Sequence, residues 1–100
     1  MDDLNRYRGR LDELDAELLR LFTERMEIAA RIGEWKKERQ LPVLDARREQ
    51  EKLSALRAQC PEELQEDAVR LFSLILELSR GRQERILRQE SGGTRDEARP

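Results

Sequence analysis

Apolar residues recur every three or four positions through a proline-free stretch from about Asp3 to Arg39. This spacing is typical of a helix that packs along its length against another helix. A guanidinium interrupts the pattern, because Arg25 stands where Leu or Ile is expected. Burying a guanidinium is costly unless an anion meets it. We therefore expect either a structural ion pair with a neighbouring helix or an anion-binding pocket inside a helical bundle. The positions of this apolar seam are Leu4, Tyr7, Leu11, Leu14, Leu18, Leu21, Arg25, Ile28, Ile32 and Trp35.

The remainder of the chain also predicts helices. Pro42 ends the first helix, and Asp45 is a suitable N-cap for a second helix over residues 46–58. Pro61, followed by two acidic residues, marks the start of a third helix that runs to about Gln89. Its inward stripe is expected to be Leu64, Ala68, Phe72, Ile75, Ser79, Gln83 and Ile86.

These elements predict an all-α fold with three helices per chain, the first of them very long. Residues 1–90 are expected to form one helical domain. The following segment, residues 91–100, has no large apolar residue and is expected to be a disordered tail.

Composition narrows the class of protein. Charged residues make up 42% of the chain and apolar residues 37%, which suits amphipathic helices with a narrow core. The net charge of −2 argues against a nucleic-acid partner. Cys60 is the single cysteine and there is no histidine, so a disulfide within the chain and histidine-based catalysis are excluded, and no metal is expected. Without a signal-peptide core or a membrane-length apolar run, we expect a cytoplasmic protein with no membrane contact.

The length of the first helix predicts a second chain. About 37 residues would extend roughly 55 Å, whereas a compact globule of 100 residues has a radius of gyration of about 13 Å. The uncovered seam therefore favours a twofold homodimer. Arg25 and Lys36 are three turns apart and share a face, about 16 Å apart along the axis. Arg8 lies about 25 Å from Arg25 on the same helix, so only an antiparallel copy could bring an Arg8 to that face.

Several polar residues fall on or beside inward faces of the predicted helices. Ser79 and Gln83 stand one turn apart, and taken alone they are better explained as buried residues that satisfy their own hydrogen bonds. For Asp45 alone, a simple N-cap is an equally good interpretation. The complete set is Arg8, Arg25, Lys36, Asp45, Arg48, Glu49, Ser79 and Gln83.

Three segments carry a resemblance to a known family: YRGRLDELDAELLRLFTERMEIAARIGEWK, LPVLDARREQE and LFSLILELSRGRQ. Over about residues 4–88 the chain resembles the all-helical chorismate mutase family, and the polar residues fill the positions of that family's pattern. The resemblance implies an isomerase that converts chorismate to prephenate by an intramolecular Claisen rearrangement, a step of the shikimate pathway toward phenylalanine and tyrosine. It also implies an interlaced homodimer with two equivalent sites, without cofactor or metal.

The resemblance further implies a role for each residue of the set. Arg25, with Arg8 from the other chain, would bind a substrate carboxylate. Lys36 and Gln83 would donate hydrogen bonds to the ether oxygen. Glu49 would accept a hydrogen bond from the ring hydroxyl, with the backbone at Asp45 nearby. Arg48 and Ser79 would complete the wall of the pocket and contact or orient the carboxylates.

Physical chemistry is consistent with these roles. Chorismate is a dianion, so its binding site needs Arg and Lys. The unimolecular reaction requires the substrate to be held in a compact conformer. Hydrogen-bond donors at the ether oxygen stabilise the negative charge that develops there.

Two alternative functions stay open. An isochorismate pyruvate lyase shares the fold but, by the same resemblance, lacks the Arg48–Glu49 pair. The second alternative is a non-catalytic helical dimer that binds a metabolite. A coiled-coil adaptor is a weaker interpretation, because it would leave Arg25 and Gln83 without a role.

Overall fold

The computed structural model of the chain describes residues 2–98, with side chains described up to residue 89. Helix α1 spans Asp2–Glu38, α2 spans Ala46–Gln59, a 3-10 turn, η1, spans Glu62–Leu64, and α3 spans Gln65–Ala98. Residues 2–98 contain no strand. The prediction of an all-α chain with one very long N-terminal helix is therefore confirmed.

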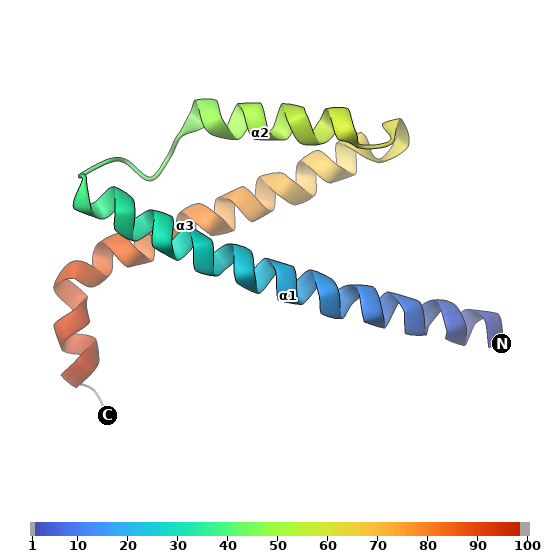
Figure 1. Cartoon of the computed structure of the whole chain (residues 1–100), viewed down its shortest axis with the longest axis horizontal. Coiled ribbons are helices and arrows are strands. Elements are labelled where there is room, and N and C mark those ends of the chain that lie inside the picture. Colours follow the sequence, from blue (N-terminus) through green and yellow to red (C-terminus); the bar gives the residue numbers. More distant parts are fainter. Residues whose placement is uncertain (1, 99–100) are drawn as a thin grey trace.

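The three helices form an open, flat arrangement (Figure 1). Helices α1 and α3 cross each other, and α2 lies along α3. Among the described residues, α2 packs against α3 but not against α1. The N-terminal half of α1 extends away from the other helices (Figure 1). The space between α1 and α2 is therefore bounded by α3 and, at one end, by the loop that carries Val43.

Local sequence explains where the helices begin. The carboxylate of Asp45 accepts a hydrogen bond from the backbone N–H of Arg48 at 3.1 Å, so Asp45 is the N-cap of α2 as predicted. The start of α3 differs from the prediction. Pro61 precedes the 3-10 turn η1, and the regular helix begins only at Gln65. The tighter turn forms because the backbone N–H of Leu64 bonds to the carbonyl of Pro61 at 2.9 Å.

The end of α3 also differs from the prediction. The helix was expected to end near Gln89, but its backbone continues to Ala98. The helix can continue because no proline lies between Gln65 and Ala98, so every residue of this segment keeps its backbone N–H donor. Residues 91–98 thus carry a helical backbone, and the last two residues of the expected tail lie outside the described part. Disorder of this tail stays a prediction. A domain boundary near residue 90 stays a prediction.

The core lies where α1 crosses α3, and small residues build it. Ala29, Ala30 and Gly33 of α1 are buried there. A Cβ atom on Gly33 would lie 3.1 Å from the Cα of Gln83 and 3.3 Å from the Cβ of Ile86. Gly33 therefore lets the two helix backbones approach closely, which brings the C-terminal turns of α1 against the polar part of α3.

This crossing gives a stability prediction. Replacing Gly33 with valine would force γ-carbons into the Gln83 backbone, and overpacking of this kind costs about 1–3 kcal/mol. We expect the melting temperature, followed by circular dichroism, to fall by several degrees. Gly9→Val is the matched control, because nothing lies within 4 Å of a Cβ at Gly9. Equal melting temperatures for the two variants would contradict the close crossing.

Much of the apolar seam remains uncovered in one chain. Apart from Arg25, every seam position is at least 40% exposed. The inward stripe predicted for α3 is correct only in part. Ser79, Gln83 and Ile86 are buried, whereas Leu64 is 50% exposed because it belongs to η1, ahead of α3. A second apolar strip on α3, which the sequence analysis missed, is exposed too: Leu71, Leu74 and Leu78. The radius of gyration is 17.9 Å, well above the value of about 13 Å for a compact chain of this length.

Candidate active site

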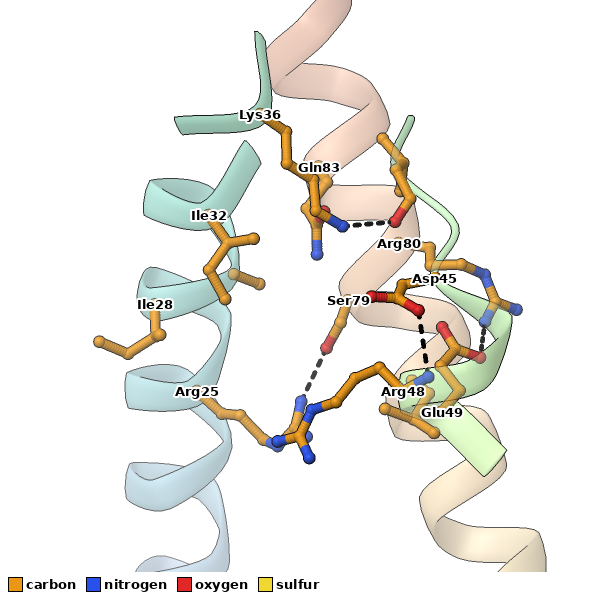
Figure 2. A pocket seen from close by; sticks show the side chains of 13 residues that line it. Arg25, Ile28, Ile32, Lys36, Asp45, Arg48, Glu49, Ser79, Arg80 and Gln83 are labelled. Atoms are coloured by element: carbon orange, nitrogen blue, oxygen red, sulfur yellow. Dashed lines mark hydrogen bonds and ion pairs between the residues drawn. The ribbon is translucent and has the colours of Figure 1, made fainter. Parts of the chain in front are cut away.

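A pocket of about 560 Å³ lies between α1 and α2, with α3 as its floor. Figure 2 shows α1 with Arg25, Ile28 and Ile32 on one side of the pocket, and Asp45, Arg48 and Glu49 from the start of α2 on the other. Apolar side chains of α1 and α3 share the lining with charged and polar groups. The lining residues are Arg25, Ile28, Ala29, Ile32, Lys36, Val43, Asp45, Arg48, Glu49, Leu76, Ser79, Arg80 and Gln83.

Arg25 reaches from α1 to the floor of the pocket. Its Nη1 donates a hydrogen bond to Ser79 Oγ at 2.9 Å (Figure 2). Among the described side chains, no carboxylate lies within 4.0 Å of this half-buried guanidinium. Of the two expectations for Arg25, the structural ion pair is therefore not found. A neutral hydroxyl orients the cation and leaves its charge available to an anion.

Lys36 and Gln83 lie together at the opposite end of the pocket from Arg25 (Figure 2). The ammonium of Lys36 donates to the carbonyl oxygen of Val43 at 2.7 Å, and Val43 is buried. This contact holds the lysine toward the pocket with two further protons left to donate. Gln83 is 7% exposed, and among the described residues its Oε1 has no hydrogen-bond partner. A buried amide oxygen without a partner is costly, so it is consistent with a ligand that brings a hydrogen-bond donor to this end. The amide nitrogen of the same side chain is itself a donor.

The first turn of α2 forms the other wall. Asp45 uses its carboxylate to cap the helix, and Arg48 extends from the same turn toward α1 (Figure 2). Glu49 forms an ion pair with Arg80 of α3. Counting all charged groups of the lining, four cations and two carboxylates give the pocket a formal charge of +2. Such a charge favours a ligand with two negative charges.

Seven of the eight residues selected from the sequence line this one pocket: Arg25, Lys36, Asp45, Arg48, Glu49, Ser79 and Gln83. Arg8 does not line it, and its side chain is exposed on the N-terminal part of α1. The sequence analysis missed Arg80. It directly follows Ser79, but no sequence signal singled it out, because its partner Glu49 lies on another helix.

No helix within residues 2–98 is both long enough and apolar enough to cross a membrane. Over the same residues, no group of three or more potential ligand side chains is arranged to hold a metal ion.

The fold and the pocket define an all-helical protein with a positively charged pocket between its helices. The chain belongs to the family described as chorismate mutase type II, whose model matches residues 7–84. The resemblance found in the sequence is therefore confirmed.

Individual relatives agree with this assignment. The chain is 25% identical to a chorismate mutase of Methanocaldococcus jannaschii over 91 residues, which cover 89% of this chain and 92% of the relative. It is 43% identical over 51 residues, or 51% of the chain, to a bifunctional chorismate mutase/prephenate dehydratase of Aquifex aeolicus. It is 34% identical over 77 residues, or 72% of the chain, to a T-protein of Haemophilus influenzae. The matched regions span only 14% and 20% of the last two relatives. No solved structure matches the chain significantly.

Proposed function

We propose that this chain is a chorismate mutase, an isomerase that converts chorismate to prephenate for aromatic amino acid biosynthesis. The observation that carries the proposal is the pair of donors, Lys36 and Gln83, at the opposite end of a doubly positive pocket from Arg25. A cytoplasmic location stays a prediction from the sequence.

The reaction suits a site of this kind. The ether C–O bond breaks while a C–C bond forms in the same molecule, and no proton is transferred. The protein must hold the folded conformer, which is a positioning task. It must also stabilise the negative charge that builds on the ether oxygen, and preorganised donors do this best in the transition state. Lys36 would supply a charged donor and Gln83 a neutral one, in a pocket whose apolar walls include Ile28 and Ile32.

The remaining residues fit the other parts of the substrate. Arg25, oriented by Ser79, would bind one carboxylate, and Arg48 from the facing wall would bind or orient a carboxylate as well. Glu49 would accept a hydrogen bond from the ring hydroxyl, next to the backbone of Asp45. With the carboxylate of Asp45 engaged as a helix cap, a contact there would come from its backbone.

An assay with two substrates tests this function against its alternatives. Purified protein is supplied with chorismate or with isochorismate, and the products are separated by chromatography. We expect prephenate from chorismate and no pyruvate from isochorismate. Salicylate and pyruvate from isochorismate would instead identify a lyase, and binding of either substrate without turnover would identify a metabolite-binding protein.

We also propose that the chain works as a homodimer whose two copies of α1 cover each other. The uncovered seam supports this, because a monomer rarely exposes so continuous an apolar surface. The exposed strip on α3, Leu71, Leu74 and Leu78, offers a further surface for the partner. An antiparallel copy would also bring its Arg8 to the pocket, where a second guanidinium would face the carboxylate bound by Arg25.

Complementation tests the contribution of Arg8 across the interface. We expect Arg8→Ala and Arg25→Ala to be nearly inactive alone. A dimer containing one chain of each kind has one intact site and one doubly damaged site, so random mixing should restore roughly a quarter of wild-type activity. Heterodimers verified by mass spectrometry that show no recovery would mean that each pocket uses residues of its own chain only.

A further inference from the structure

The ion pair between Arg80 of α3 and Glu49 of α2 stands apart from the other ion pairs of the described residues. Its side chains are 32% and 22% exposed, whereas those of every other pair are at least 48% exposed. Exposed pairs contribute little to stability because water and salt screen them. A partly desolvated, hydrogen-bonded pair is stronger and holds its groups in one geometry.

The position of this pair matters because α2 is weakly anchored at the pocket end. No residue of α2 is buried, and its half-buried apolar residues, Leu53 and Leu56, lie one and two turns beyond Glu49 on the same face. The other residues of its first turn, 46–48, are exposed. Contact with α3 in this turn therefore depends on Glu49.

The opposite end of α2 has its own attachment. Gln65 at the start of α3 donates through Nε2 to the backbone carbonyl of Arg57 at 2.9 Å. Loss of the Arg80–Glu49 pair would therefore loosen the first turn of α2, while buried Val43 before it and the attachment at its C-terminal end stay in place.

We propose that Arg80 is a positioning residue that holds Glu49, and with it the first turn of α2 and Arg48, against α3. Arg80 contacts Oε1 of Glu49, which leaves Oε2 to accept a hydrogen bond from a ligand. The part of this inference that concerns substrate binding rests on the proposed function. It extends that function by assigning Arg80 to the geometry of the α2 wall rather than to the substrate itself.

Steady-state kinetics on the 100-residue chain test the positioning role. Arg80→Met keeps the aliphatic stem but removes the charge, and we expect KM to rise about tenfold or more with a smaller change in kcat. In a Glu49→Gln background the same substitution should have little further effect, because Arg80 acts through Glu49. Arg80→Lys should restore part of the loss. Arg70→Met, an exposed arginine of α3 outside the pocket, is the control and should behave as the wild type.

Hydrogen exchange tests the same inference without turnover. In Arg80→Met, the amides of residues 46–52 should exchange faster while those of α1 keep their rates, whatever reaction the protein catalyses. If Arg80→Met does not fold, Arg80→Lys replaces it, with the same segment expected to exchange faster. Additive effects of Arg80→Met and Glu49→Gln would overturn the inference by placing Arg80 on the substrate, and unchanged exchange in α2 would overturn it as well. Failure of the wild type to form prephenate would refute only the proposed function.

Discussion

Lys36→Ala should lower kcat/KM for chorismate by at least about 100-fold, the loss typical of removing one donor to a developing oxyanion. The ammonium is held toward the pocket by the Val43 carbonyl at 2.7 Å and lies beside Gln83. The loss should appear mainly in kcat, because charge on the ether oxygen develops only in the transition state. Steady-state rates of chorismate consumption measure both constants.

The next residue provides a matched control. Lys37 has the same side chain, but its ammonium reaches the backbone carbonyl of Ile86 at 3.5 Å and does not line the pocket. Lys37→Ala should therefore keep near wild-type activity. Equal losses in the two variants would indicate that general electrostatic attraction, rather than a directed donor, explains the effect of Lys36.

Gln83→Glu should convert a pH-independent donor into a pH-dependent one. An amide donates at every pH, whereas a carboxyl group donates only when protonated, and the ordinary pKa of glutamate is about 4.3. At neutral pH the variant would present an anion to a developing anion, so we expect a loss of at least about 100-fold. Activity should rise as the pH falls toward the pKa of the new carboxyl group.

Profiles of kcat against pH measure this effect. The wild type should be flat over the interval in which Gln83→Glu gains activity, since it has no titrating group at that position. Gln83→Leu, which cannot donate at all, should stay inactive throughout. A flat profile for Gln83→Glu would remove the side chain of Gln83 from the mechanism.

Periodicity located the α1 and α3 sides of the pocket. On a helix the angular position of each residue is known, so the spacing of Arg25 and Lys36 placed both on one face, and the pair Ser79 and Gln83 could be placed on an inward stripe. Pro42 and Asp45 marked the break between α1 and α2. Because the connecting loop is short, α2 starts close to the end of α1 that carries Lys36. These features depend on neighbours in the sequence, so no tertiary information was needed.

Features that depend on how helices cross could not be read in this way. The seam of large residues was expected to be the buried face, but Ala29, Ala30 and Gly33 form the contact with α3, because a close crossing requires small side chains. Arg80 resembled a surface charge until the fold placed Glu49 opposite it. The burial of Val43, in the loop before α2, likewise depends on tertiary packing.

The most direct test of the account is a crystal structure of the protein with a stable bicyclic ether dicarboxylate that imitates the rearranging substrate. We predict that one carboxylate will contact Arg25 and that the ether oxygen will lie between Lys36 Nζ and the amide of Gln83. An ether oxygen that meets neither donor, or a ligand bound outside the space between α1 and α2, would contradict the account.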